Sequence, residues 1–106
     1  MATKAELLLL MSRYYTGAMN GVTAQTLAAS LACEQRHIRK LVTELREEGT
    51  AVCGTPRDGY FIAATPEELE HTLNFLRARA MHSLVLESRL RKLPLLELLG
   101  QLRLKT

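Results

Sequence analysis

Two pairs of side chains have types and spacings that could perform chemistry. Cys33 and His37 lie four residues apart, so a helix would bring a thiol and an imidazole to one face. Cys33, however, occupies an apolar position between two predicted helices, where a thiol usually packs as a small hydrophobic group. His71 and His82 lie eleven residues apart, which is about 16 Å along a helix at ~1.5 Å per residue. Neither pair predicts a catalytic dyad or a zinc site.

Acidic side chains near position 67 are a third candidate, for general acid–base catalysis. Glu67, Glu68 and Glu70 follow Thr65-Pro66, which is a typical helix start with a capping residue and a proline at the first position. Carboxylates in a first turn interact favourably with the helix dipole, which explains them without catalysis. The sequence also has no glycine-rich phosphate loop and no serine-triad motif. We therefore expect a protein without enzymatic activity, cofactor or metal.

The side chains that best suit a function are long hydrogen-bond donors on a predicted helix over residues 35–48. In this helix Ile38, Leu41 and Leu45 form an apolar stripe at the spacing of a buried face. Polar residues occupy the opposite side, since each residue turns about 100° from the one before. They are Gln35, Arg36, Arg39, Lys40 and Thr43. Such donors can contact base edges in a major groove or phosphate oxygens, and the sequence does not separate these roles.

Three short elements precede this helix and must position it. Apolar residues spaced by three and four predict a first helix, and Thr23 is a good N-cap for a second. The predicted elements are a helix over residues 3–15, a very short strand at Val22 and a helix over residues 24–31. A tight turn at Ala32-Cys33 then leads into the helix over residues 35–48, which has Glu34 at its cap position.

A β-hairpin is expected after this helix, which Gly49 ends. Two short apolar runs, residues 50–53 and 60–63, flank a turn that contains glycine, proline and aspartate. The order of helix, short strand, helix, tight turn, helix and hairpin is that of a winged helix-turn-helix. The sequence therefore predicts a mainly α fold with a small β-hairpin.

Residues 23–63 resemble the winged helix-turn-helix that opens biotin-repressor-type bacterial regulators. That family's helix-turn-helix typically reads Leu-Ala-x-x-Leu-Gly-Val-Ser, and this chain reads Leu27-Ala28-Ala29-Ser30-Leu31-Ala32-Cys33-Glu34. The family's hairpin typically ends in Gly-Tyr and an apolar residue, as Gly59-Tyr60-Phe61 does here. Alanine thus replaces the turn glycine, and glutamate replaces the capping serine. The ligase activity of that family lies outside the matching residues and is not implied.

The resemblance implies sequence-specific binding of double-stranded DNA. Under it the residues that face the major groove are Gln35, Arg36, His37, Arg39 and Lys40. Arg57, at the tip of the hairpin, would contact phosphate or the minor groove. The arginine-rich helix after the hairpin is also loosely similar to that of small phage-borne DNA-binding proteins. We expect a transcriptional regulator or phage replication-control factor. A protein-binding adaptor or assembly factor stays open as an alternative, because the helix over residues 35–48 is nearly charge-balanced.

The last third of the chain predicts a helical extension. A helical pattern continues from Pro66 to about Leu93 without a breaker, and Pro94 then opens a short last helix. Leucines at mostly helical spacing line both helices, and one small core cannot cover them all, so we expect two copies to pair through them. These leucines are Leu69, Leu73, Leu76, Leu84, Leu90, Leu95, Leu98, Leu99 and Leu102.

This organisation predicts a winged helix-turn-helix domain over residues 1–65 and a helical dimerisation extension over residues 66–106. The sequence leaves open whether residues 84–106 continue one helix or fold back. The leucines could instead fold back onto the first domain, or lie on a membrane. A membrane role is not expected, because Glu97 interrupts a short stripe that offers little apolar area.

Composition agrees with a small protein of the cytoplasm. The chain of 106 residues has 47% apolar residues, enough for a core without disulfides. Its two cysteines suit a reducing compartment, and the apolar run Leu7 to Met11 is too short for a signal peptide or a membrane span. The net charge is +3, but residues 33–60 carry five bases and five acids while residues 77–106 carry seven bases and two acids. This balance allows a polyanionic partner without requiring one.

Overall fold

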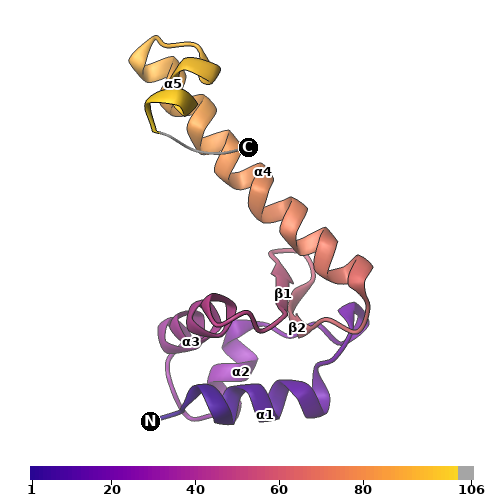
Figure 1. The fold of residues 1–106 in the computed structure, drawn as a ribbon. Coiled ribbons are helices and arrows are strands. Elements are labelled where there is room, and N and C mark those ends of the chain that lie inside the picture. The colour runs from indigo at the N-terminus through magenta and orange to yellow at the C-terminus, as the bar shows by residue number, and fades with distance from the viewer. Residues whose placement is uncertain (103–106) are drawn as a thin grey trace. The chain divides into compact units, whose positions relative to one another are not determined.

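The computed structural model describes residues 1–102 and is mainly helical, with a single two-stranded hairpin in that range (Figure 1). Its elements are α1 (Lys4–Tyr14), the 3-10 turn η1 (Ala18–Asn20), α2 (Ala24–Ser30), α3 (Gln35–Glu47), β1 (Val52–Thr55), β2 (Gly59–Ile62), α4 (Pro66–Arg91) and α5 (Leu95–Gln101). The predicted fold class, mainly α with a small β-hairpin, is confirmed. The chain forms two compact units, residues 1–72 and the residues from 73 onward, so their boundary lies inside α4.

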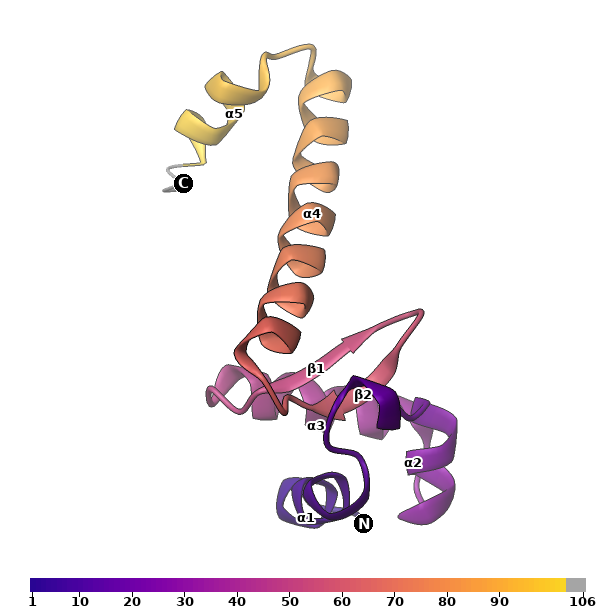
Figure 2. The ribbon, with the colours of Figure 1, turned by 90° about the vertical axis from the view of Figure 1, so that its right-hand side faces the viewer.

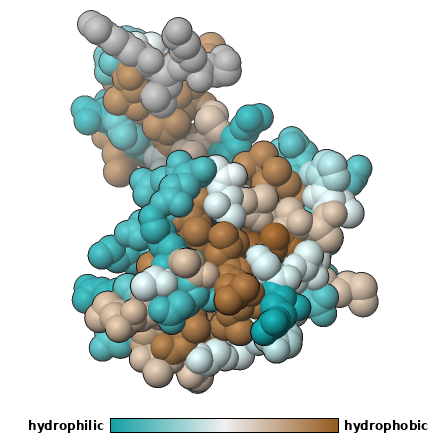
Figure 3. Space-filling view, turned by 60° about the horizontal axis from the view of Figure 1, so that its bottom comes forward, coloured by the Kyte–Doolittle hydropathy of each residue, from teal (hydrophilic) through white to brown (hydrophobic). Residues whose placement is uncertain are grey.

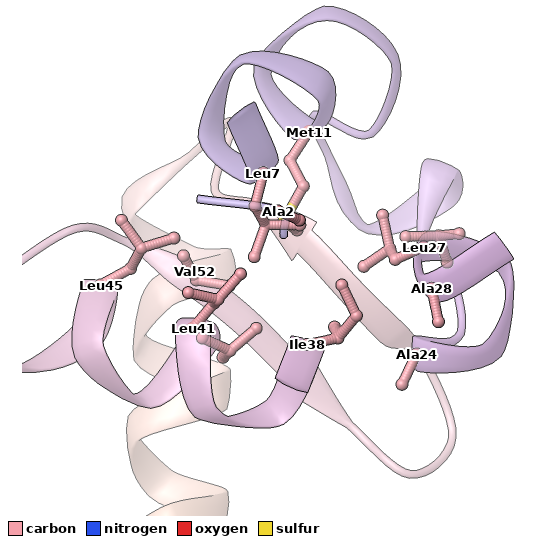
Figure 4. Close-up of a cluster of buried hydrophobic side chains, with 12 residues drawn as sticks. Ala2, Leu7, Met11, Ala24, Leu27, Ala28, Ile38, Leu41, Leu45 and Val52 are labelled. Atoms are coloured by element: carbon pink, nitrogen blue, oxygen red, sulfur yellow. The ribbon is translucent and has the colours of Figure 1, made fainter. Parts of the chain in front are cut away.

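Helices α1, α2 and α3 enclose the core of the first unit (Figure 4). The Thr3 hydroxyl accepts from the Glu6 N–H at 3.2 Å, and the Thr23 hydroxyl accepts from the Thr26 N–H at 3.1 Å, so both helices begin at threonine caps. The predicted apolar stripe of α3 is buried as expected. Large buried side chains of this core are Leu7, Met11, Leu27, Ile38, Leu41, Val42, Leu45 and Val52. Each contributes roughly 1.5–3 kcal/mol through burial.

Helix α1 also carries apolar side chains on its outer side. Leu7 and Met11 are buried, but Leu9 is 66% exposed and Tyr14, which continues the apolar spacing, is 61% exposed. Figure 3 brings the α1 side of the molecule forward and shows apolar side chains among the polar ones there. Single exposed apolar residues are common on protein surfaces, so Leu9 and Tyr14 by themselves indicate no function.

The turn between α2 and α3 has the conformation that usually requires glycine. Ala32 adopts φ 52°, in the left-handed region. The Cys33 N–H donates to the Ala28 carbonyl at 3.0 Å, and the Ala32 N–H donates to the Ala29 carbonyl at 3.4 Å. These two bonds form a Schellman motif, which ends α2 and sets the direction in which α3 begins. Ala32 therefore occupies the left-handed position that glycine usually takes in such a turn.

The hairpin pairs β1 and β2 antiparallel, with Val52 opposite Ile62 and Thr55 opposite Gly59. Strand β1 lies two residues later than predicted, and β2 begins one residue earlier. The reason is a shorter turn that local hydrogen bonds close. The Thr55 hydroxyl accepts from the Asp58 N–H at 3.1 Å and lies 3.2 Å from the Asp58 carboxylate, to which it donates.

Val22, for which a very short strand was predicted, forms an isolated antiparallel bridge with Tyr60 instead. Its N–H donates to the Tyr60 carbonyl at 2.8 Å, and its carbonyl accepts from the Tyr60 N–H at 2.7 Å. Gly59 is required at this crossing, because its φ is 74° and a Cβ there would lie 2.8 Å from the Val22 carbonyl oxygen. The hairpin is thereby attached to the segment that leads into α2.

Polar contacts fix the start of α4 to the first unit. The Thr65 hydroxyl accepts from the Glu68 N–H at 3.2 Å, as expected of a helix cap. The Glu68 carboxylate accepts from the N–H groups of Ala18 and Ala64, both at 2.8 Å. These backbone hydrogen bonds hold the pKa of the Glu68 carboxyl below its ordinary value, because they stabilise the charged form.

Two buried side chains complete this attachment. The Thr72 hydroxyl is buried and accepts from the Gly54 N–H at 3.3 Å. The Cys53 sulfur is also buried, lies 3.8 Å from the Glu68 carbonyl oxygen, and has its thiol pKa raised by burial. Cys33 packs against the core as predicted, and neither cysteine is in a disulfide. Both thiols therefore serve as small packing groups.

The second unit contains the rest of α4 together with α5. Helix α4 ends at Arg91, and Lys92 adopts φ 57°. The Lys92 N–H donates to the Arg89 carbonyl at 3.2 Å, and the Leu93 N–H donates to the Ser88 carbonyl at 2.8 Å, which is a second Schellman motif. The chain turns there, and α5 runs back rather than extending α4 (Figure 2). This answers the question that the sequence left open.

The turn changes the role of two predicted interface residues. Leu98 and Leu99 on α5 are buried within the single chain, with 1% and 8% of their surface exposed, whereas the sequence placed them in a dimer interface. Residues 103–106, the end of the predicted extension, lie outside the described residues. Within residues 1–102, no helix is both long and apolar enough to cross a bilayer.

Candidate nucleic-acid interface

The outer side of α3 presents a group of exposed polar side chains, which we call the basic face. It consists of Gln35, Arg36, Arg39, Lys40 and Thr43, all exposed. The opposite side of the helix is held in the core through Ile38 and Leu41, so these polar side chains are directed outward by the packing of α3. The structure thus brings together the five α3 positions that the sequence placed on one surface.

Contacts within the basic face leave its cations available. Arg39 donates from Nη2 to the Gln35 side-chain oxygen at 3.4 Å, and the Thr43 hydroxyl donates to the Arg39 carbonyl at 3.0 Å. Within residues 1–102, neither Arg36 nor Lys40 forms an ion pair or a side-chain hydrogen bond. Carboxylates therefore do not occupy the groups that a polyanion would need.

The acidic residues of α3 gather around a cation from another helix. Lys4 on α1 forms an ion pair with Glu48, and this contact raises the pKa of the Lys4 ammonium, with Glu44 and Glu47 adding to the effect. Three acids, Glu44, Glu47 and Glu48, thus lie near Lys4 at the end of α3, whereas the bases of the basic face lie toward its start. The exposed N-cap residue Glu34 is the acid at that start.

Arg46 is the one base of α3 that turns inward. Its Nε donates to the Val52 carbonyl at 2.8 Å, and its guanidinium carbon lies 6.0 Å from the centre of the Tyr60 ring. Nη2 is buried and has no hydrogen-bond partner among residues 1–102. Arg46 thus links the end of α3 to the hairpin and adds nothing to the basic face. Sequence reasoning missed this role, because it depends on β1 and β2 lying beside the helix.

His37 does not join the basic face, although the resemblance placed it there. Its side chain is partly buried, and Nε2 lies 2.7 Å from the Ala2 carbonyl oxygen, to which it donates. The ring lies about 100° around the helix from Ile38, at the edge of the apolar stripe, where the N-terminal segment covers it. His37 therefore fixes the N-terminus to α3. Within the described residues, no hydrogen bond joins it to Cys33.

The hairpin turn carries the remaining candidate, Arg57. Its side chain is exposed between Pro56 and Asp58. The Asp58 carboxylate accepts from Thr55 within the turn and lies 3.8 Å from Nε2 of His71. Local contacts thus hold Asp58, the acid next to Arg57. Arg57 lies at the end of the hairpin opposite the connection from α3, so it forms a second, separate point of positive charge.

The predicted dimer interface is divided by the structure. Leu73, Leu76, Leu90 and Leu102 are exposed, with Leu90 at 85%. The half-buried members are Leu69, Leu84 and Leu95, and the fully covered ones are Leu98 and Leu99. Only part of the predicted set is therefore available to another molecule.

Comparison of the chain with family models, curated proteins and solved structures finds no match. The case for a function therefore depends on the geometry of the basic face and the hairpin.

Proposed function

We propose that this protein binds double-stranded DNA in a sequence-specific manner, with α3 in the major groove and Arg57 of the hairpin on the backbone or in the minor groove. The observation that carries the proposal is the exposure of Arg36 and Lys40 and their lack of an acidic partner among the described residues. Both are exposed on the outer side of a helix whose other side is buried, and neither is paired with an acid within residues 1–102.

The side chains of the basic face suit this role chemically. Arginine and lysine can donate to guanine or to phosphate oxygens, and the Gln35 amide can both donate to and accept from adenine. Thr43 adds a hydroxyl. Phosphate contacts would supply affinity, and base contacts would supply sequence preference. The rigid attachment of α3 through its apolar stripe favours a fixed register on the groove.

We further propose that the protein acts as a homodimer in the cytoplasm, as a transcriptional regulator or replication-control factor without enzymatic activity. The exposed leucines of the second unit support pairing, and two free cysteines suit a reducing compartment. A two-fold dimer favours a palindromic site, with half-sites about one helical turn apart. The resemblance of residues 23–63 to biotin-repressor-type regulators points the same way.

The proposal is tested by gel shift on random duplexes at low and moderate salt. We expect binding by the natural chain, and its loss in the double variant Arg36→Ala with Lys40→Ala. Each lost phosphate contact should reduce the slope of log affinity against log salt by about one. Arg13→Ala, which removes an exposed cation from α1, is the matched control and should retain binding. The double variant should keep the unfolding temperature of the natural chain.

Three results would overturn sequence-specific DNA binding through the basic face. The first is no complex with the natural chain even at low salt, where phosphate contacts are strongest. The second is equal loss in the Arg13→Ala control, which would indicate a general charge effect. The third is co-purification with a protein partner whose binding survives replacement of Arg36, Lys40 and Arg57, which would favour the adaptor function.

A further inference from the structure

The part of α4 in the second unit has two different apolar sides. On one side Leu84 and Val85 are partly buried and Ser88 is 6% exposed. On the other side Leu76, Leu86 and Leu90 are 37%, 46% and 85% exposed. At about 100° per residue, Ser88 lies roughly 140° around the helix from Ser83, whereas Leu76 and Leu90 lie within roughly 20° of it. Among the described residues of the second unit, one side of α4 is therefore covered and the side centred on Ser83 is open.

On the open side, leucines are placed symmetrically about Ser83, and residues of opposite charge or different size stand at the other matched distances. Leucines stand seven residues before and after it, at Leu76 and Leu90. Opposite charges stand four residues away, at Arg79 and Glu87. Three residues away, the small Ala80 is balanced by the large Leu86. A helix surface with this pattern is complementary to itself when a second copy is turned by 180°.

We propose that a second copy of this chain docks antiparallel on this side of α4, with the two-fold axis at Ser83. Leu76 then packs against the partner's Leu90, close to the line along which the two helices face each other. Arg79 faces the partner's Glu87, and each of these contacts occurs twice because the interface is isologous. Small residues at the centre allow the helices to approach closely. The leucine pairs lie about 10 Å to either side of the axis at ~1.5 Å per residue.

Charge selects the antiparallel arrangement. A parallel pair in register would place Arg79 beside the partner's Arg79 and Glu87 beside the partner's Glu87, which disfavours it. The Glu87 carboxylate accepts from Nε of Arg91 at 2.9 Å, and a carboxylate can accept further hydrogen bonds. The Arg79 guanidinium carbon lies 5.8 Å from the centre of the Phe75 ring, and within residues 1–102 Arg79 forms no ion pair with an acid.

This inference rests on the homodimer of the proposed function and names its surface, but it does not require DNA. Sedimentation velocity of the full-length protein without DNA tests it. We expect a dimer for the natural chain and, for R79E and for E87R separately, dimerisation weakened about tenfold or more, because each variant places like charges at two contacts. An equimolar mixture of R79E and E87R should recover the dimer, since opposite charges then meet at both contacts.

The mixture also controls for folding, because two misfolded variants would not restore each other. Leu96→Gln changes an 82% exposed leucine on α5 and should leave the dimer unaffected. A monomeric natural chain, unchanged dimerisation in R79E and E87R, or a mixture that stays monomeric would each overturn the antiparallel contact. Loss of the dimer in Leu96→Gln alone would assign the interface to α5 instead. DNA binding can fail in the gel shift while these outcomes hold, so the two proposals fail separately.

Discussion

Replacing Ala32 by glycine should stabilise this protein. Within residues 1–102, α2, α3 and α4 end in the same pair of hydrogen bonds, and one or two positions after each helix a residue has a positive φ. At the end of α3 this residue is Gly49, with φ 87°, whereas α2 uses Ala32 with φ 52° and α4 uses Lys92 with φ 57°. Glycine adopts this conformation without the steric cost that a Cβ atom brings, so the alanine and the lysine are strained at these positions.

The size of the effect follows from two opposing terms. A left-handed conformation costs an L-residue about 1–2 kcal/mol relative to glycine. Glycine in turn loses about 0.4–1 kcal/mol through the greater freedom of the unfolded chain. Because Ala32 is exposed, removing its methyl group sacrifices little burial. We therefore expect Ala32→Gly to raise the free energy of unfolding by about 0.5–1 kcal/mol.

Gly49→Ala is the matched reverse change. No atom lies within 4 Å of the position that a Cβ on Gly49 would take, so the penalty comes only from the backbone. We expect it to lower the free energy of unfolding by about 0.5–1 kcal/mol. The two sites flank α3, about 20 Å apart along its axis at ~1.5 Å per residue, so their effects should add and the double variant should resemble the natural chain.

Urea denaturation followed by circular dichroism at 222 nm measures both changes. The midpoint should shift while the dependence on urea stays constant, which separates a change in stability from a change in the unfolded state. DNA binding by Ala32→Gly should be unchanged, because the turn keeps its hydrogen bonds. If Ala32→Gly is neutral or destabilising while Gly49→Ala destabilises, residue 32 is not left-handed in solution and the reasoning fails.

Two further changes test the attachment of α4. Glu68→Gln should lower the unfolding temperature at pH 7, because the carboxylate accepts from the N–H groups of Ala18 and Ala64. Folding lowers the pKa of the Glu68 carboxyl. The stability advantage of the natural chain over Glu68→Gln should therefore be full above the ordinary pKa of 4.5 and be lost as the pH falls from there through the lowered pKa of the folded state. A stability difference that does not change with pH would contradict this. Thr72→Val should cost about 1–2 kcal/mol in urea denaturation, because the buried Gly54 N–H loses its acceptor. Thr72→Ser keeps the hydroxyl and should cost less, and equal losses would mean that the bond contributes nothing.

Local chemistry made most of the helix boundaries predictable. Thr23 and Thr65 cap α2 and α4, and Gly49 ends α3, where the sequence placed each of them. The apolar stripe of α3 was equally clear, because four buried positions recur at helical spacing within 13 residues. These signals depend on residues within one or two turns of each other, so no knowledge of the rest of the fold is needed.

Features that depend on distant neighbours were not predictable. His37 is held by the Ala2 carbonyl and Arg46 by the Val52 carbonyl, and neither contact has a signal in the residues around it. The hairpin register differs from the predicted one because hydrogen bonds between Thr55 and Asp58 close the turn. Several residues in this segment suit a turn, so the sequence did not indicate which of them would close it. The direction of α5 followed from the conformation of Lys92, a residue that seldom adopts a positive φ.

The two proposals become linked if both hold, and the link can be measured. When a dimer binds two half-sites, the second contact becomes intramolecular once the first has formed. The dimer therefore binds the duplex more tightly than a single copy does. R79E should then bind a palindromic duplex more weakly than the natural chain although its basic face is intact. The mixture of R79E and E87R should recover this affinity together with the dimer. The Arg36→Ala, Lys40→Ala variant should instead remain dimeric without binding. Weaker binding by R79E that the mixture fails to recover would mean that Arg79 touches DNA directly, and that the positive charge of the second unit belongs to the interface with nucleic acid.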